Sequence, residues 1–177
     1  MKALLAKAGV VAIFTIALDQ LTKGLARGLL ELCTIHGAVG CERVRLVGHV
    51  ELIRVRNAGS AFGFSQDLWL WTPIATAAVA LAVVYLRSGR PTRGLAVAAG
   101  LQVGGAFGNL ADRVVLGGVT DFIHLGAGPV FNLADLFLAA GAVLAIYRLS
   151  QESGMRSRAT RDLTDQSVRI HREEVLT

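Results

Sequence analysis

Four aspartates lie within or directly beside apolar segments of a chain in which 53% of the residues are hydrophobic. They are Asp19, Asp112, Asp121 and Asp135. An ionised side chain at the centre of a bilayer costs roughly 2.5 to 3.5 kcal/mol, so carboxylates there are paired, hydrated, protonated or functional. Two neighbouring aspartates share one proton, because like charges a few ångströms apart do not both ionise easily. One then acts as a base on water and the other as an acid, without a cofactor.

Other hydrolytic chemistries find little support. The chain has no His-Glu-x-x-His motif, and its four histidines lack the spacing of metal ligands, so we expect no metal site. Ser60 lies in "NAGSAFG", which lacks the Gly-x-Ser-x-Gly turn, and no phosphate-binding glycine loop is present. His124 is more typical of a packed residue than of a catalyst.

Spacing alone leaves structural readings open for the same residues. Asp135 can be a first-turn acid that complements a helix dipole, and Asp121 can be a turn residue. Asp112 with Arg113 can be a terminal ion pair. Asn57 and Gly59 then belong to an ordinary turn.

Four apolar runs determine where these residues lie. They cover about residues 4–22, 68–86, 94–112 and 130–148, each close to the roughly 20 residues that span a bilayer. Charged residues make up 18%, below the roughly 25% of soluble domains. We expect an all-α polytopic membrane protein, with a single domain over residues 1–149 and a polar cytoplasmic tail over 150–177.

Basic residues set the expected orientation. Four spans place both termini on one side, and the short loop "RSGRPTR" between the second and third spans carries three arginines, which favours a cytoplasmic location. This topology explains the net charge of +5 better than a nucleic-acid partner does. The polar clusters "DQLTK", "RNAGSAFG", "GGAFGNLADR", "VTDF" and "FNLAD" then all lie on the opposite side.

The loop over about 24–67 is expected to carry a small sheet. Its middle, "VRLVGHVELIRVR", alternates partly and predicts one or two short strands, and "RGLLELC" before it predicts a short interfacial helix. Arg54 and Arg56 share a strand face, which meets either lipid phosphates or solvent. Cys33 and Cys41 form a disulfide if the loop faces an oxidising compartment, or stay free thiols.

Helical periodicity divides the third span into two faces. Gly100, Gly104 and Gly108 are four residues apart and predict close helix packing. Gln102, Gly105, Asn109 and Asp112 fall on another face, which should point into the bundle. Asp19 and Lys23 have the spacing of a helical ion pair, and Asn132 and Asp135 share a face at the start of the fourth span.

The five clusters, in this order over about residues 10–148, resemble the signal peptidase II (lipoprotein signal peptidase) family. The resemblance implies four transmembrane helices plus a small periplasmic sheet that cradles the substrate. It implies that Asp121 and Asp135 are the catalytic pair of an aspartic endopeptidase. The expected reaction removes the signal peptide of a diacylglyceryl-modified prolipoprotein, just before its lipidated cysteine.

The resemblance also assigns supporting roles. Asn57, Asn109, Arg113 and Asn132 would bind the substrate backbone or orient the pair, with Asp112 in the same motif set. Asp19 and Lys23 would tie the first helix to the site, and Gly59 and Gly104 would allow close backbone approach. The expected enzyme is a monomer in the bacterial inner membrane, with its site near the periplasmic face. Its expected partners are prolipoprotein and phospholipid, with no nucleic acid, metal or cofactor.

Two other functions stay open at this stage. A membrane carrier or lipid-binding scaffold would use the aspartates to relay protons or bind cations, and would want them near mid-bilayer. A degenerate member of the family would bind lipoproteins without cutting them, although both candidate aspartates are present.

Overall fold

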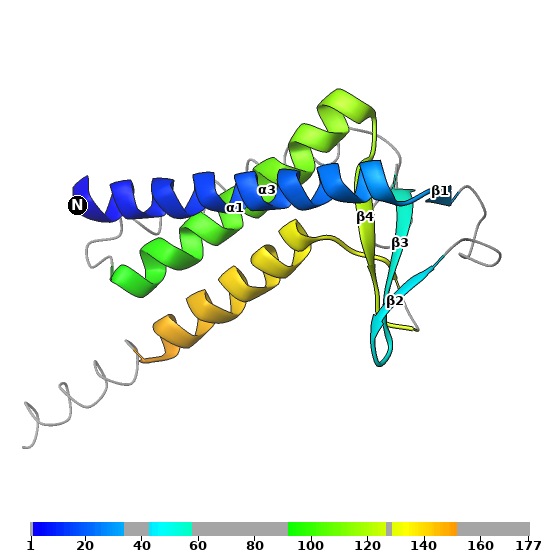
Figure 1. Cartoon of the computed structure of the whole chain (residues 1–177). Helices are drawn as coiled ribbons and strands as arrows, with labels where there is room; N and C mark the ends of the chain where they lie inside the picture. The colour runs from blue at the N-terminus through cyan, green and yellow to red at the C-terminus, as the bar shows by residue number, and fades with distance from the viewer. Residues whose placement is uncertain (1, 34–42, 58–91, 127–128, 152–177) are drawn as a thin grey trace, which may run out of the picture.

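The computed structural model describes residues 2–33, 43–57, 92–126 and 129–151 (Figure 1). Its elements in chain order are α1 (Lys2–Leu29), β1 (Leu32–Cys33), β2 (Val44–Val47), β3 (Val50–Asn57), α3 (Arg93–Leu116), β4 (Val119–His124) and the C-terminal helix (Leu133–Gln151). Within these ranges, three helices are long and apolar enough to cross a membrane. The second predicted span, Gly59, Cys41 and most of the polar tail lie outside the described residues.

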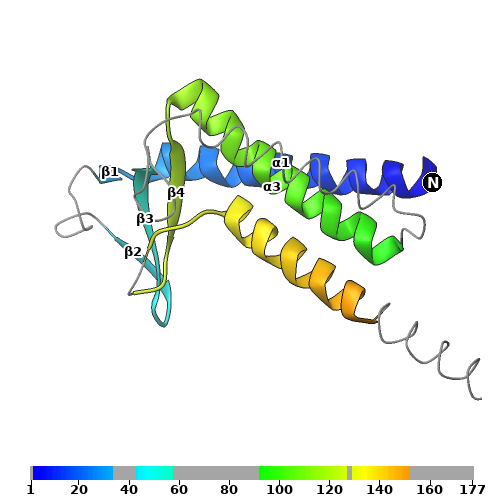
Figure 2. The ribbon, with the colours of Figure 1, turned by 180° about the vertical axis from the view of Figure 1, so that it is seen from behind.

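The sheet lies at one end of the helices, as both views show (Figures 1 and 2). α1 and α3 reach the sheet at their C-terminal ends, whereas the C-terminal helix begins there. The N-terminus lies at the opposite end. The motifs around Asp19, Asp112, Asp121 and Asp135 therefore meet at one end of the helices, which is the clustering that the apolar pattern predicts.

Small residues let α1 and α3 approach closely. A methyl group added at Gly100 would lie 2.7 Å from the carbonyl oxygen of Ala8, and one at Gly104 would lie 2.8 Å from that of Ala12. The next small residue on the other face, Gly105, lies against the backbone of the C-terminal helix, where an added methyl group would be 2.7 Å from the oxygen of Ala134. The predicted glycine face of the third span is thus confirmed.

The predicted interfacial helix in "RGLLELC" is wrong. α1 continues without a break to Leu29, and Leu32 and Cys33 already belong to β1. The residues that prolong α1 include leucine, alanine and arginine, which favour helices, and Ala26 is buried. α3 has conventional ends: the Thr92 hydroxyl accepts from the Leu95 amide, and Gly117 (φ 71°) closes the helix in the left-handed conformation.

β3 is the strand to which the other three pair. β2 and β3 form an antiparallel hairpin, which confirms the strands predicted in "VRLVGHVELIRVR". β1 pairs with β3 in parallel, and β4 pairs with it antiparallel. In this last register Val55 lies opposite Asp121, and Asn57 lies opposite Val119. The end of β3 therefore delivers Asn57 to the strand that carries Asp121.

Two arginines of β3 attach the sheet to the helices. Arg54 donates to the carbonyl oxygens of Arg27 (3.1 Å) and Leu30 (3.4 Å), at the C-terminal end of α1. Arg56 donates to the carbonyl oxygen of Leu116, at the end of α3. Both guanidinium groups therefore complement the negative end of a helix dipole, and Arg56 is also exposed, as the solvent alternative predicts. Cys33 is disulfide-bonded.

Candidate active site

The segment before the C-terminal helix runs beside β4 and brings two motifs together. Phe131 forms an isolated antiparallel bridge with Ile123: its amide donates to the Ile123 carbonyl (3.0 Å), and its own carbonyl accepts from the Ile123 amide (2.8 Å). Ile123 is two residues from Asp121, and Phe131 directly precedes Asn132. The bridge thus fixes Asn132 next to the aspartate of β4.

Asn132 contacts both Asp121 and Asp135. Its side-chain amide donates to Asp121 Oδ1 at 2.6 Å. Its side-chain oxygen accepts from the backbone N–H of Asp135 (3.1 Å), and its backbone N–H donates to Asp135 Oδ2 (3.2 Å). This reciprocal pair is a capping box at the start of the C-terminal helix. Because the oxygen of Asn132 must face a backbone donor, its NH₂ group must face Asp121.

Asp121 lies in a setting that favours its protonated form. The residue is 3% exposed, and besides Asn132 it accepts a hydrogen bond from Asn57 Nδ2 (3.0 Å). Burial raises the pKa of Asp121 from 3.8 to about 6, and the charge of Asp135 contributes in the same direction, whereas the two amide donors and the charge of Lys23 lower it. A buried strand residue, rather than a turn residue, therefore carries this carboxyl group.

Asp135 has a different set of contacts. Its Oδ2 takes part in the capping box, and its Oδ1 accepts from Asn109 Nδ2 at 2.9 Å. Asp135 is therefore a first-turn acid, as the structural alternative predicts, and its Oδ2 caps its own helix. Its Oδ1 instead accepts a hydrogen bond from a residue of α3. As the third residue of its helix, Asp135 also lies in the favourable field of the helix N-terminus.

A buried ion pair supports Asn109 and the C-terminal helix. Lys23 Nζ lies 2.8 Å from Asp19 Oδ2, and neither side chain is exposed at all. Lys23 also donates to Asn109 Oδ1 at 2.7 Å, and Asp19 Oδ1 accepts from the backbone N–H of Ala134 at 2.9 Å. The predicted ion pair of the first helix is confirmed. It connects α1 to α3 through Lys23, and to the C-terminal helix through Asp19.

Asp112 anchors the start of β4. Its Oδ2 accepts from the backbone N–H of Thr120 (2.9 Å), next to Asp121, and its Oδ1 accepts from Gln20 Nε2 (3.1 Å). Arg27 lies 3.5 Å from Asp112 Oδ1 and donates to the Thr120 hydroxyl (3.1 Å). Sequence reasoning missed Gln20, Arg27 and Thr120. A signal existed for Arg27, which follows Asp19 and Lys23 at the four-residue spacing of one helix face.

Three further residues from the sequence analysis, Arg113, Gly104 and His124, lie in the described part of the structure. Arg113 donates to the carbonyl oxygen of Asn109 at 3.4 Å, and its charge acts on Asp112, Asp121 and Asp135. Gly104 lies between α3 and α1, as described above. His124 faces away from the pair, with its Nδ1 3.4 Å from Glu51 Oε2, which agrees with its expected non-catalytic role.

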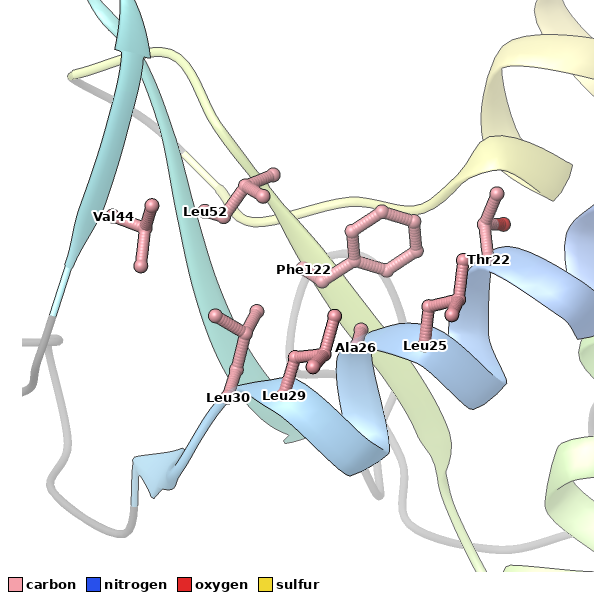
Figure 3. Close-up of a pocket in the computed structure, with 8 residues that line it drawn as sticks. All are labelled: Thr22, Leu25, Ala26, Leu29, Leu30, Val44, Leu52 and Phe122. Atoms are coloured by element: carbon pink, nitrogen blue, oxygen red, sulfur yellow. The ribbon is translucent and has the colours of Figure 1, made fainter.

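An apolar pocket of about 350 Å³ lies between the end of α1 and the sheet (Figure 3). Phe122 and Leu52 line it from the sheet, and Leu25 and Leu29 from α1. Thr22 is its one polar residue, and that hydroxyl already donates to backbone carbonyls of α1. Because side chains alternate along a strand, Phe122 faces this pocket while Asp121 faces the other way. The pocket therefore does not contain the aspartate pair.

Fold and site together define a membrane protein with two aspartates held by a shared asparagine at one end of its apolar helices. Residues 11–151 match the family model described as signal peptidase (SPase) II. The chain is 35% identical to the lipoprotein signal peptidase of Shouchella clausii (strain KSM-K16), over 86% of this chain and 98% of that protein. It is 35% identical to the one of Bacillus subtilis (strain 168), over 84% of this chain and 96% of that protein.

Solved structures agree with these sequence matches. One bacterial membrane enzyme superposes with a TM-score of 0.70 at 27% identity, covering 84% of this chain and 90% of the other. A second superposes with a TM-score of 0.69 at 26% identity, covering 81% and 92%. The chain belongs to the signal peptidase II family, a family of peptidases, which confirms the resemblance seen in the five motifs.

Proposed function

We propose that this protein is a membrane-embedded aspartic endopeptidase that removes the signal peptide from diacylglyceryl-modified prolipoproteins, cutting just before the lipidated cysteine. Its catalytic pair is Asp121 and Asp135. The observation that carries the proposal is the position of Asn132, which hydrogen-bonds both carboxyl groups: its side-chain amide donates to Asp121 and its backbone N–H donates to Asp135. Family membership supplies the substrate class.

The pair works with one proton between its two carboxyl groups. The ionised aspartate takes a proton from water while the water oxygen bonds to the scissile carbonyl carbon, and the protonated aspartate gives its proton to the carbonyl oxygen. The tetrahedral intermediate then collapses. The amide nitrogen receives a proton from the first aspartate, the C–N bond breaks, and a hydroxyl of the intermediate returns a proton to the second. The products are a carboxylic acid and a free amine.

The same proposal gives supporting roles to the residues around the aspartate pair. Asn57, Asn109 and Asn132 orient the carboxyl groups through the hydrogen bonds described above. Arg113 places positive charge near both of them. Lys23 and Asp19 hold α1 against the site, and Asp112 holds the start of β4. Gly59 keeps its expected role in close backbone approach and lies outside the described residues.

The membrane arrangement follows from the charge pattern. We place residues 1–149 in one domain of four spans, with both termini and the tail 150–177 in the cytoplasm of a bacterium. The sheet and the aspartate pair then lie near the periplasmic face of the inner membrane. A prolipoprotein is itself anchored in the bilayer and presents its cleavage site near that surface, so a monomer with its site at this depth reaches the bond without lifting the lipid into water.

A gel-shift assay tests the proposal. Purified protein in detergent is incubated with a diacylglyceryl-modified prolipoprotein, in parallel with Asp121→Asn, Asp135→Asn and the control Glu51→Gln, which removes a carboxylate outside the pair. We expect cleavage by the wild type and the control and by neither aspartate variant. Cleavage by either Asp→Asn variant would show that the pair is wrongly assigned. A folded wild type that does not cut would overturn the proposed activity.

A further inference from the structure

The two carboxyl groups of the pair differ in what surrounds them, among the residues that the structure describes. The side chains that donate to Asp121 are two neutral amides, Asn57 and Asn132. The side chain that donates to Asp135 is Asn109, whose oxygen is bound by the ammonium group of Lys23. Asp135 is therefore joined to Lys23 through one amide, whereas Asp121, on which the charge of Lys23 also acts, has no such hydrogen-bonded link among the described residues.

Lys23 determines which way the side-chain amide of Asn109 is turned. A lysine ammonium group can only donate hydrogen bonds, so the atom of Asn109 that lies 2.7 Å from Lys23 Nζ must be the oxygen. The NH₂ group of Asn109 is thereby turned toward Asp135 and offers it an N–H. A positive charge on Lys23 polarises the Asn109 amide in the direction that strengthens this N–H donor, because linked hydrogen bonds reinforce one another. An ionised carboxylate accepts such a bond better than a neutral acid does.

The charges around the pair agree with a single ionised member. Three basic groups pair with or act on the four aspartates, namely Lys23, Arg27 and Arg113 on Asp19, Asp112, Asp121 and Asp135, whereas Arg54 and Arg56 at the same end bind helix carbonyl oxygens. If the pair retains one proton, the charges of these three basic groups and of the four aspartates are equal in number. A buried cluster of low dielectric constant favours such neutrality. Arg113 acts on both members, and more strongly on Asp121 than on Asp135, so its charge does not by itself favour ionisation of Asp135.

We propose that Lys23 is a positioning residue for the reaction: through Asn109 it holds Asp135 as the ionised member of the pair, so that Asp135 takes the proton from water and Asp121 supplies the proton to the scissile carbonyl. This assignment rests on the proposed function. After collapse of the intermediate, Asp135 has passed its proton to the leaving amine and Asp121 has recovered one from the diol. Each residue thus returns to its starting state without exchanging roles.

Two further features support this assignment. Asp135 lies at the positive end of a helix dipole and accepts a backbone N–H in its capping box, both of which favour a negative charge. Burial raises the pKa of Asp121 to about 6, and this residue lies in a strand rather than in the first turn of a helix.

The test is the dependence of kcat/KM on pH for four variants of the full-length protein, with the same prolipoprotein substrate. Asn109→Ala acts on the side of Asp135, and Lys23→Met acts there through Asn109 and also removes a charge that acts on Asp121. Asn57→Ala acts on the side of Asp121. Arg27→Gln is the control, because it removes a cation of the same cluster that binds Asp112 and Thr120 rather than Asn109. A substitution that only disturbed the geometry of the active site would lower kcat/KM at every pH and would leave the pH of both limbs unchanged.

We expect a bell-shaped wild-type profile, in which the acidic limb reports the ionised member and the basic limb reports the protonated member. Lys23→Met should move the acidic limb up by about one pH unit, at the lower end of the effect of a nearby opposite charge. Asn109→Ala should move the same limb in the same direction. Asn57→Ala should move the basic limb up, and Arg27→Gln should leave the acidic limb in place.

The opposite pattern would reverse the roles of the two aspartates: an acidic limb moved by Asn57→Ala and a basic limb moved by Asn109→Ala. Limbs that stay fixed in both Lys23→Met and Asn109→Ala would leave Lys23 with a purely structural role and overturn the proposal. If Lys23→Met does not fold, Asn109→Ala alone decides the question, because it keeps the ion pair of Lys23 with Asp19. A wild type that does not cleave at all would instead refute the proposed function.

Discussion

Two clusters of charged side chains in this protein have similar nitrogen-to-oxygen distances in their ion pairs but differ greatly in exposure to solvent. The inner cluster, between the helices, contains Lys23 and Asp19 at 2.8 Å, both without exposure. The outer cluster, on the sheet, contains Glu51 with Arg43 at 3.1 Å and Arg45 at 3.7 Å, where the arginine side chains are 36% and 75% exposed. Water screens the outer pairs, which are worth about 0 to 1 kcal/mol each, whereas a broken inner pair leaves an uncompensated buried charge. The inner cluster is therefore the one on which the site depends.

Removal of one inner charge should cause the largest loss of stability. Asp19→Leu leaves Lys23 without its close partner and the Ala134 amide without an acceptor, and we expect a loss of about 3 to 5 kcal/mol. Glu51→Leu, the same change in the outer cluster, should lower the stability far less, because water screens its pairs. Thermal denaturation in detergent measures both. Equal losses would mean that burial does not distinguish the two clusters.

The pH dependence of stability should separate Asp121 from the outer carboxylate. Because the pKa of Asp121 is raised from 3.8 to about 6, the folded state binds its proton more tightly than the unfolded state does. This contribution is fully present below pH 3.8 and is lost as the pH rises through about 6. Two pKa units correspond to about 3 kcal/mol.

Melting temperatures of the wild type and Asp121→Asn across this pH range provide the measurement. The wild type should lose stability relative to the variant as the pH rises. Glu51 has the opposite shift: its hydrogen bond with His124, together with Arg43, lowers its pKa. Glu51→Gln should therefore not remove the loss of stability between pH 4 and 6. Parallel curves for the wild type and Asp121→Asn would contradict the assigned environment of Asp121.

A smaller effect should follow from separating the helices that enclose the inner cluster. Gly104→Ala would place a methyl group 2.8 Å from the Ala12 carbonyl oxygen, so the backbones of α1 and α3 must move apart, at a cost of about 1 to 3 kcal/mol. Gly9→Ala is the matched control on α1, since nothing lies within 4 Å of its added methyl group. A similar melting temperature for both variants would show that the helix contact is loose.

The smallest effect belongs to the most exposed member of the outer cluster. Arg45→Gln removes a guanidinium group that lies 3.7 Å from Glu51 and is 75% exposed. We expect the melting temperature to stay within about one degree, because exposed pairs contribute little and salt screens them. A loss comparable to that of Asp19→Leu would require a second contact of Arg45 that matters for folding.

The elements of the site could largely be predicted, because each leaves a local pattern. Apolar length predicts the helices that carry Asp19, Asn109 and Asp135. Partial alternation predicts the hairpin of β2 and β3. The spacing of Asp19 and Lys23 predicts their ion pair, since neighbours on a helix face are fixed by the period of 3.6 residues.

The hydrogen bonds and pairings that join different elements leave no such pattern in the sequence. The bond from Lys23 to Asn109 joins residues 86 apart in the chain, and the one from Asp19 to the Ala134 amide joins residues 115 apart. Helical period identifies the face on which a residue lies but not which helix that face meets. The parallel pairing of β1 with β3, and the attachment of Arg54 and Arg56 to helix ends, depend likewise on how the sheet packs. The family resemblance supplied Asp121 and Asp135 as a pair, which spacing alone left open.

The ion pair of α1 also bears on how the protein is made. Asp19 and Lys23 are four residues apart on one helix, so α1 contains a counter-ion for its own carboxylate before the later helices are synthesised. The charge of Asp19 is thus compensated within α1, before Asn109 and Ala134, which follow in the chain, have been synthesised. The bond from Lys23 to Asn109 needs α3, and the bond from the Ala134 amide to Asp19 needs the C-terminal helix. The network around the aspartate pair is therefore complete only when both later helices have packed against α1.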